Sequence, residues 1–340
     1  MILDERIDAL VQLGKHFNSK DPTWQAAKAQ AERENAWFTQ PFIEKAVGAI
    51  TEQFLQRNAL EAVAKRYNLK PQNPAPLRVG LVLAGNIPLV GFHDLMCAFL
   101  TGHHAVVKPS SKDTVLPRYV INFLGNRSGG DALFTVAENL KGCDAYIATG
   151  GNNTSRYFAY YFAPYPHIIR KNRTSVAILN GSETEEDLAA LADDVHLYFG
   201  LGCRNVTKLY VPDGYDFMAL LHALKKYNYL IEHNKFKNNY DYHLAVHLLN
   251  RKRYMSTDAL LLIEDPALFA PIAQLNYEFY KDAAAVTQIL GGNEAVQAVV
   301  GQGFVPFGQA QCPAIDSFAD GVDTIAFLQA LPRTAQLRSP

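Results

Sequence analysis

The sequence lacks the features that mark a secreted, membrane-spanning or nucleic-acid-binding chain. Its 340 residues include only four cysteines, none of them in a C-x-x-C pair, which argues against a disulfide framework and a zinc site. Lys and Arg (32) balance Asp and Glu (33), so there is no electrostatic reason to bind nucleic acid or an anionic membrane. No apolar run approaches the roughly 20 residues that a membrane-spanning helix needs. We therefore expect no nucleic acid and no membrane among its partners.

Two further absences concern location and metal. Residues Met1 to Arg6 lack the basic segment and apolar core of a secretory signal, and with reduced cysteines we expect a cytoplasmic protein. His243 and His247 have the i, i+4 spacing of metal ligands on a helix, but there is no H-E-x-x-H motif and no nearby third ligand. The sequence therefore predicts no metal site.

The first 70 residues carry apolar side chains at helical spacing, as in Ile43, Val47, Ile50 and Phe54. No chemistry is evident there. We predict that residues 1–70 form a helical segment that packs on the domain that follows it.

From residue 71 onwards, buried strands alternate with helical patterns. Near-continuous apolar runs end in turn residues, and each is followed by apolar residues at helical spacing; the runs are 77–84, 105–109 and 144–149. This alternation predicts an α/β fold with a doubly wound parallel sheet and helices on both faces. We assign residues 71–174 to a dinucleotide-binding domain.

Residues 175–318 are predicted to be a second α/β domain, and residues 319–340 a C-terminal helix and tail. Within the second domain the pattern predicts helices at 183–199, 217–229 and 293–300 and strands at 206–211 and 259–264. The segment 234–242 is rich in Asn, Lys and Tyr and is predicted to be an exposed loop.

Cys203 is the strongest candidate for a catalytic residue. It follows a Gly-Leu-Gly turn, and the flanking patterns place it in a tight bend between a helix and a strand. Glycines before it allow another group to approach the backbone closely. The adjacent Arg204 would lower the pKa of the thiol and so favour the nucleophilic thiolate. The alternative is a small buried side chain with no chemical role.

The first strand is not followed by G-x-G-x-x-G, so the usual dinucleotide fingerprint is absent. Parallel sheets nevertheless bind ligands where their strands end. The loops at these ends contain Asn86, Lys108 and the segment 149–151.

Five short motifs follow one another along the chain: Asn86 to Pro88, Val107 to Pro109, Thr149 to Gly151, Gly202 to Arg204 and Pro306 to Gly308. In this order they resemble the aldehyde dehydrogenase superfamily and, within it, the fatty acyl-CoA reductases of the luciferase-associated LuxC type. The resemblance covers about residues 75–315. It implies an aldehyde-dehydrogenase-like fold with a nucleotide-binding domain and a catalytic domain.

The resemblance also implies roles for individual residues. Cys203 would be the nucleophile, and the Asn86 amide with the Cys203 N–H would form the oxyanion hole. The implied cofactor-binding residues are Lys108, Pro109, Ser110, Thr149, Gly150 and Gly151. The hydroxyls and charge of Ser110, Ser111 and Lys112 suit a 2′-phosphate, so we favour NADP(H) over NAD(H). From the residues alone, Asn86 could instead cap the following helix, and Lys108 could be a solvated strand end.

One departure from the family pattern bears on the reaction. Hydrolytic aldehyde dehydrogenases carry a Glu-Leu-Gly-Gly-Lys segment whose glutamate activates water. Here the corresponding stretch, 169–175, is cationic and includes Arg170. A cation cannot take a proton from water, so an acyl enzyme should be hydrolysed slowly. The candidate substrate-binding residues are Arg170, Arg204 and Phe307; the alternative for the cationic stretch is solvated charge at a strand edge.

The resemblance, together with this departure, implies NADPH-dependent reduction of a fatty acyl-CoA to the aldehyde, through an acyl-cysteine intermediate and with CoA as the leaving group. One alternative is a CoA-acylating aldehyde dehydrogenase that runs in the oxidative direction. Another is a non-catalytic nucleotide-binding subunit of an acyl-processing complex. The resemblance further implies a homo-oligomer that works beside acyl-transferring or acyl-activating partner enzymes.

Overall fold

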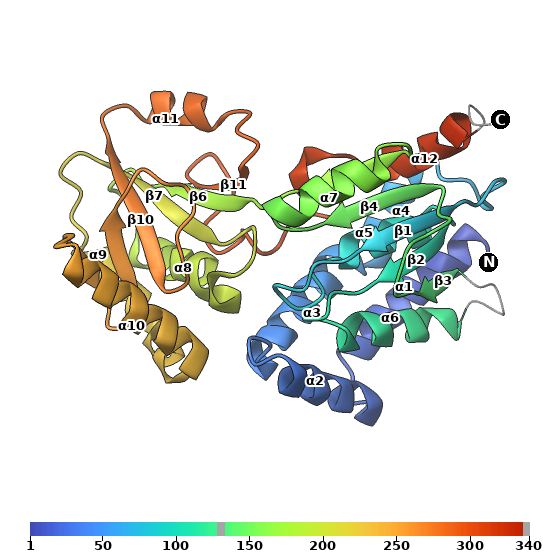
Figure 1. The fold of residues 1–340 in the computed structure, drawn as a ribbon, viewed down its shortest axis with the longest axis horizontal. Helices are drawn as coiled ribbons and strands as arrows, with labels where there is room; N and C mark the ends of the chain where they lie inside the picture. Colours follow the sequence, from blue (N-terminus) through green and yellow to red (C-terminus); the bar gives the residue numbers. More distant parts are fainter. Residues whose placement is uncertain (128–132, 336–340) are drawn as a thin grey trace. The chain divides into compact units, whose positions relative to one another are not determined.

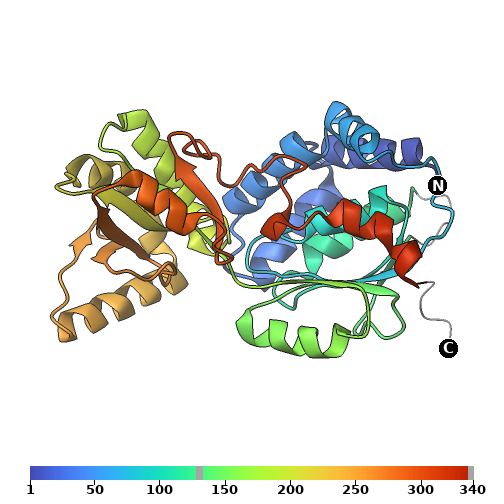
Figure 2. The ribbon, with the colours of Figure 1, turned by 90° about the horizontal axis from the view of Figure 1, so that it is seen from above.

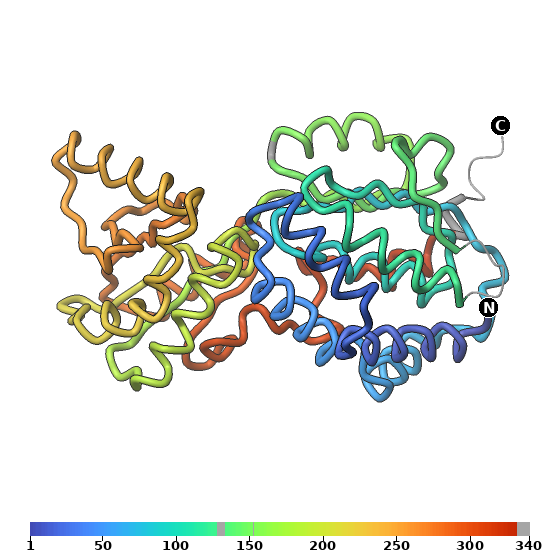
Figure 3. Tube along the Cα trace, turned by 90° about the horizontal axis from the view of Figure 1, so that it is seen from below, coloured from blue at the N-terminus to red at the C-terminus, as the bar shows by residue number. Residues whose placement is uncertain are grey.

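The computed structural model describes residues 1–127 and 133–335 (Figure 1). The chain divides into two compact units. Unit 1 consists of Met1–Asn172 and Cys312–Pro340, and unit 2 consists of Arg173–Gln311. The sequence pattern predicts the corresponding boundaries at 174/175 and 318/319. The C-terminal segment thus returns to unit 1, as the red part of the trace shows (Figure 3).

Unit 1 is built on a five-stranded parallel sheet with the order β3-β2-β1-β4-β5. Its strands are β1 (Arg78–Val82), β2 (His104–Lys108), β3 (Phe134–Val136), β4 (Ala145–Thr149) and β5 (His167–Arg170). Its helices are α1 (Leu3–Phe17), α2 (Pro22–Glu34), α3 (Gln40–Phe54), α4 (Arg57–Arg66), α5 (Phe92–Leu100), α6 (Val115–Gly125), α7 (Asn152–Phe162) and α12 (Thr324–Ala335).

The two faces of this sheet are covered unequally. Val79 and Leu81 of β1 point into the large core that the N-terminal helices, α5, α6 and α12 share. The opposite face is smaller: Val106 and Tyr146 pack there, and Phe162 of α7 stacks on Tyr146 with ring centroids 4.0 Å apart. Figure 2 shows α7 alone on its side of the sheet. Alternation of side chains along each strand produces both layers.

Unit 2 contains a six-stranded sheet with the order β11-β6-β7-β10-β9-β8. Its strands are β6 (Thr174–Ile178), β7 (Val206–Pro212), β8 (Met255–Ser256), β9 (Leu261–Glu264), β10 (Gln274–Tyr280) and β11 (Val296–Gly301), and β8 alone is antiparallel to its neighbour. Its helices are α8 (Glu185–His196), α9 (Met218–Leu224), α10 (Asn234–Leu249) and α11 (Ala283–Leu290), with 3₁₀ turns η1 (Leu197–Gly200) and η2 (Lys225–Glu232).

The predicted α/β fold with a parallel sheet, a second sheet and N-terminal helices is confirmed. Two local predictions are wrong. Residues 293–300 are not a helix, because 296–301 form the edge strand β11, paired with β6. Residues 234–242 are not a loop but the first part of α10, whose buried residues Phe236 and Tyr240 lie one turn apart. Within the described residues, no helix is both long and apolar enough to cross a bilayer.

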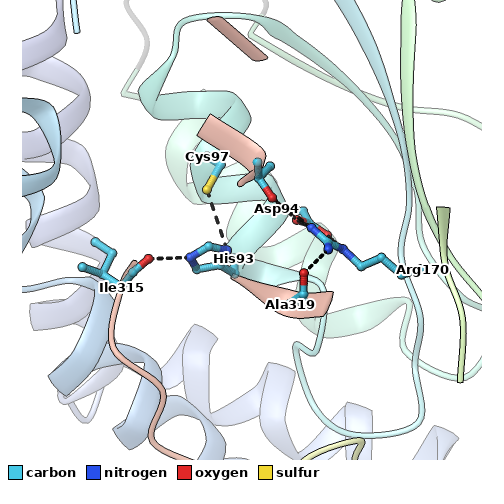
Figure 4. A network of polar contacts seen from close by, with 7 residues as sticks. His93, Asp94, Cys97, Arg170, Ile315 and Ala319 are labelled. Atoms are coloured by element: carbon cyan, nitrogen blue, oxygen red, sulfur yellow. Dashed lines mark hydrogen bonds and ion pairs between the residues drawn. The ribbon is translucent and has the colours of Figure 1, made fainter. Parts of the chain in front are cut away.

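A buried ion pair ties together distant parts of unit 1 (Figure 4). Arg170, the last residue of β5, donates to both carboxylate oxygens of Asp94 on α5, from Nη2 at 2.7 Å and from Nε at 3.2 Å. It also donates to the Ala319 carbonyl at 2.5 Å and the Thr324 hydroxyl at 2.9 Å. Burial acts to raise the pKa of Asp94, but the guanidinium outweighs it and holds that pKa below its ordinary value. The pair is therefore charged, and it holds the returning segment near residues 319–324 against α5.

Beside this pair, His93 Nε2 lies 2.7 Å from the Ile315 carbonyl, and its Nδ1 lies 3.7 Å from Cys97 Sγ. The returning segment thus contacts α5 at His93 through Ile315, and at Asp94 through Thr324 and, by way of Arg170, Ala319 (Figure 4).

Removing one member of the buried pair should destabilise unit 1 strongly. We expect Asp94→Leu to lower the free energy of unfolding by about 3–5 kcal/mol, because it removes the carboxylate that balances the buried Arg170 charge. The double variant Asp94→Leu/Arg170→Met should recover part of this loss. Urea denaturation of both variants measures the effect. As a control, Arg66→Ala removes an exposed ion pair with Asp316 and should cost about 0–1 kcal/mol. A loss from Asp94→Leu no larger than that of the control would contradict the prediction.

Candidate functional site

The turn that leads to Cys203 has an unusual backbone. Three consecutive residues, Tyr198, Phe199 and Gly200, have φ values of 56°, 57° and 73°. For residues other than glycine this left-handed conformation costs roughly 1–2 kcal/mol each. Packing stabilises it here: Phe199 is only 2% exposed, and its ring lies 4.6 Å from that of His233 and 5.7 Å from that of Phe236. The chain therefore reverses sharply after α8 and enters β7.

Asn205 fixes the backbone around Cys203. Its side chain is fully buried, and Nδ2 donates to three carbonyls at the end of α8, those of Asp194 (3.0 Å), Val195 (3.3 Å) and Leu197 (2.9 Å). Its Oδ1 accepts the N–H of Gly202 at 2.8 Å. The Asn205 side chain thus donates to carbonyls that have no partner within the helix, and it also fixes the position of Gly202, the residue before Cys203.

Cys203 lies in the turn between η1 and β7, as predicted, and is partly exposed. Its carbonyl accepts a hydrogen bond from Ser175 Oγ of β6 at 3.1 Å. Arg204 interacts electrostatically with it: burial lowers the pKa of the guanidinium, and attraction to Cys203 opposes this. By contrast, Cys97 and Cys143 are buried, and burial raises the pKa of both thiols.

The Pro-Phe-Gly segment is attached to the same helix that leads to Cys203. The fully buried Asp194 of α8 accepts the N–H of Gly308 at 2.6 Å and that of Ala310 at 3.0 Å. Gly308 has φ +78°, and a Cβ there would lie 3.0 Å from Ala190 Cβ of α8, so glycine suits this close approach. Phe307, a candidate for substrate binding, sits half-buried in this turn. Asp194 and Asn205 together make α8 the support of both segments.

In unit 1, the loops singled out from the sequence meet at one edge of the sheet. Val82 at the end of β1 is in register with Lys108 on one side and with Ala148 on the other. The loops that follow β1, β2 and β4 therefore leave the sheet side by side. The strand order also reverses between β1 and β4, which is where open parallel sheets form ligand crevices. The predicted residues at this edge are Asn86, Lys108, Pro109, Ser110, Thr149, Gly150 and Gly151.

Asn86 is partly exposed in the loop after β1. It is not the cap of the next helix, because α5 begins at Phe92 with Gly91 at the capping position. Gly85 lies against the neighbouring loop: a Cβ there would come within 2.7 Å of Ser110 Cβ. Only glycine fits this contact, which brings the loops carrying Asn86 and Lys108 together.

Lys108 is exposed at the end of β2. Gly151 occupies the capping position of α7 and provides no side-chain cap, so the first N–H groups of that helix are not occupied by a capping side chain. Such N–H groups suit an anion.

Arg170 departs from the expected role. It is 3% exposed, and its N–H groups donate to Asp94, Thr324 and Ala319. It is not a solvated charge at a strand edge, and we leave it out of the proposed substrate site. His247, considered above as a metal ligand, contacts Gln274 at 2.8 Å. No group of three metal-ligating side chains occurs among the residues that the structure describes.

Neither Asn205 nor Asp194 is among the site residues predicted from the sequence. Asn205 had a weak signal, since an asparagine directly before a strand often satisfies nearby backbone groups. Asp194 had none, because its partners lie more than 110 residues further along the chain.

No protein-family model matches the sequence, and no curated protein sequence matches it. Comparison of structures does find similar folds. One is a putative aldehyde dehydrogenase from Burkholderia cenocepacia, with a TM-score of 0.65 and 12% identity over 88% of this chain and 74% of that one. Another is the NADP-dependent glyceraldehyde-3-phosphate dehydrogenase from Bacillus halodurans C-125 complexed with NADP, with a TM-score of 0.65 and 15% identity over 88% and 74%. A third is a Mycobacterium tuberculosis aldehyde dehydrogenase complexed with NAD+, with a TM-score of 0.65 and 14% identity over 88% and 73%. The chain thus has the aldehyde dehydrogenase fold.

The raised pKa of Asp194 predicts a specific pH dependence of stability. Burial raises this pKa to about 6 from an ordinary 3.8. Because the folded state holds the proton more tightly, the contribution of Asp194 is full below about pH 4 and is lost as the pH rises to about 6. Relative to Asp194→Asn, the wild-type protein should lose roughly 3 kcal/mol of unfolding free energy over this range and little above it. Urea denaturation of both proteins from pH 4 to pH 8 tests this. A difference that is constant across the range would refute it.

Proposed function

We propose that the chain is a nicotinamide-dependent oxidoreductase that reduces a fatty acyl-CoA thioester to the aldehyde through an acyl-Cys203 intermediate. The observation that carries the proposal is the partly exposed Cys203, held by Asn205 in a turn beside Arg204. A guanidinium near a thiol favours the thiolate, which is the nucleophilic form.

The environment of Arg170 supports acyl transfer over hydrolysis. Its position resembles that of the segment whose glutamate activates water in hydrolytic aldehyde dehydrogenases. Here the side chain is a buried cation paired with Asp94. It cannot act as a base, so water is not activated from this position. A thioester substrate needs no such base, because one thioester simply replaces another.

The residues at the sheet edge of unit 1 fit a nicotinamide nucleotide. Gly85 allows the loops after β1 and β2 to touch, and the start of α7 suits a pyrophosphate. By the resemblance, exposed Lys108 would hold a ribose. Two of the similar structures are complexes with NADP and NAD+, which supports this class of cofactor. Exposed Ser111 and Lys112 favour the 2′-phosphate of NADP(H), with NAD(H) as the alternative.

In the proposed cycle, Cys203 Sγ attacks the acyl carbonyl carbon and forms a new C–S bond. The amide of Asn86 and the Cys203 N–H stabilise the oxyanion, and its collapse breaks the bond to CoA, which leaves as a thiolate and takes up a proton. The bound reduced nicotinamide supplies the hydride. Once the carbonyl carbon is reduced, the same donors stabilise the second oxyanion. Its collapse releases the aldehyde and restores the Cys203 thiolate. Half-buried Phe307 would contact the acyl chain, and Arg204 the substrate.

The same cycle in reverse is a CoA-acylating aldehyde dehydrogenase, and turnover must be measured in both directions to choose between them. The non-catalytic alternative predicts that Cys203→Ser leaves function intact. We also propose a cytoplasmic homo-oligomer that receives acyl groups from acyl-transferring or acyl-activating partners.

The acyl enzyme can be trapped directly. We incubate the protein with short-, medium- and long-chain acyl-CoA without nicotinamide and locate the added acyl mass by peptide mapping. The expected adduct is on Cys203, and it should disappear on addition of NADPH as aldehyde is released. Asn86→Ala should slow acylation by about 10²–10³-fold, because one oxyanion donor is lost.

Cys312→Ser is the matched control, since Cys312 is the other partly exposed cysteine. It should retain the adduct, whereas Cys203→Ser should lose it. The proposal would be refuted if acylation persisted in Cys203→Ser, or if none of the acyl-CoA substrates acylated the wild type.

A further inference from the structure

Asp113 is a buried carboxylate that the proposed cycle does not use. It lies between β2 and α6 and is 3% exposed. Its Oδ2 accepts the N–H of Leu89 at 2.9 Å. Among the described residues its Oδ1 has no partner within hydrogen-bond geometry, although the Leu116 N–H lies near enough to act on the carboxylate electrostatically. An unsatisfied buried polar atom costs about 1–3 kcal/mol, so its presence calls for an explanation.

The hydrogen bond from Leu89 joins two loops at the sheet edge. The first loop, residues 83–91, contains Asn86, and the second loop, residues 108–114, contains Lys108 and Ser110. The two are already in contact where the Leu83 N–H donates to the Lys108 carbonyl at 3.1 Å. Asp113 adds a side-chain link, and its own N–H donates to the Ser110 carbonyl at 3.0 Å. Asp113 therefore connects the loop that carries Asn86, the proposed oxyanion donor, to the loop that carries Lys108 and Ser110, the proposed cofactor-binding residues.

The far side of the second loop is held by α2 and the residue after it. Asn35 Nδ2 donates to the Lys112 carbonyl at 3.0 Å, and Thr114 Oγ1 donates to Glu34 at 3.3 Å. The second loop is thus a fixed support, against which Asp113 can hold the first.

The first loop needs such a hold because its backbone is strained. Leu89 has φ +55°, a left-handed conformation that costs a residue other than glycine about 1–3 kcal/mol. Its side chain is 4% exposed, so packing and the bond to Asp113 together maintain this conformation. Asn86 lies three residues before Leu89, and a relaxed Leu89 would therefore move its amide.

A cavity of about 10 Å³, lined by Asp113, Leu89, Phe92, Pro117 and neighbouring apolar side chains, adjoins the carboxylate. It has room for about one water molecule. Burial raises the pKa of Asp113 to about 7, against the effect of the Leu89 and Leu116 N–H groups. Near neutral pH the group is thus close to half protonated, and a neutral amide is a fair replacement for it.

We propose that Asp113 is a positioning residue that couples the Asn86 loop to the Lys108–Ser110 loop, so that nicotinamide-nucleotide binding and oxyanion stabilisation depend on one buried hydrogen bond. This inference rests on the proposed function. A purely structural role would not predict which functions are lost. The proposed positioning role requires that NADPH binding and Cys203 acylation are impaired together.

The test compares Asp113→Ala and Asp113→Asn with wild type in two assays that share no chemistry. One measures the Kd for NADPH by fluorescence, and the other the rate of Cys203 acylation by acyl-CoA without nicotinamide. Asp113→Ala should weaken NADPH binding and slow acylation by about tenfold or more each, because small displacements of positioned groups have effects of this size. In Asp113→Asn, the Kd for NADPH and the acylation rate should stay within about threefold of the wild-type values, since the amide oxygen can still accept the Leu89 N–H.

Thr101→Val is the control for stability alone. It removes a buried hydroxyl that bonds the Cys97 carbonyl at the other end of α5, and it should leave both assays unchanged. Hydrogen exchange of residues 83–91 and 108–114 adds a readout independent of ligands, and it should rise in both segments of Asp113→Ala only.

If Asp113→Ala behaves like the control, or alters only one of the two assays, the coupling is refuted while the proposed function stands. If the wild type neither binds NADPH nor is acylated, the proposed function fails, and this inference fails with it.

Discussion

The structure depends on buried carboxylates that fasten the chain where it passes between its two units. The chain leaves unit 1 after residue 172 and returns at residue 312. Within unit 1, Arg170 and Asp94 hold the end of β5 and the returning segment at Ala319. Within unit 2, Asp194 holds Gly308 and Ala310, just before the chain leaves that unit. Each unit therefore fixes the part of the connecting segment that belongs to it: residues 308–310 in unit 2 and residue 319 in unit 1.

Three buried aspartates illustrate how the partner decides the charge. Asp94 faces a guanidinium, so its pKa is lowered despite burial. Asp113 and Asp194 accept backbone N–H groups instead, and burial raises their pKa values to about 7 and about 6, with the charge of Asp193 adding to the effect at Asp194. Backbone dipoles thus do not compensate for the lost hydration, whereas a full opposite charge does. Asp94 therefore keeps its charge, whereas Asp113 and Asp194 change protonation near pH 7 and pH 6 and contribute through hydrogen bonds.

Much of the fold could be predicted from the sequence, because its signals are local. Apolar runs such as 77–84 ended in turns, and they are strands of the parallel sheet. The predictions failed where local signals misled. Val296, Val299 and Val300 have helical spacing, yet pairing with β6 makes them an edge strand. In α10 a polar composition concealed the buried pair Phe236 and Tyr240. Glycines marked the turn at Cys203, but the side chains that hold that turn depend on tertiary contacts: Asn205 left only a weak signal, and Phe199 none that distinguishes its partners.

Arg170 shows why a reading of the motif alone was insufficient. The sequence indicated that a catalytic base had been replaced by a cation, and it suggested two roles for that cation, in the substrate site or in solvent. Its contacts with Asp94, Thr324 and Ala319 indicate a third role, in holding the fold. A glutamate at this position would place two carboxylates within the same buried network, and like charges there would favour a protonated, non-basic acid. The contacts of Arg170 with Asp94 and the returning segment therefore do not suit a carboxylate base at this position. The proposed acyl transfer needs no base at this position, so it is compatible with the buried network that Arg170 forms in unit 1.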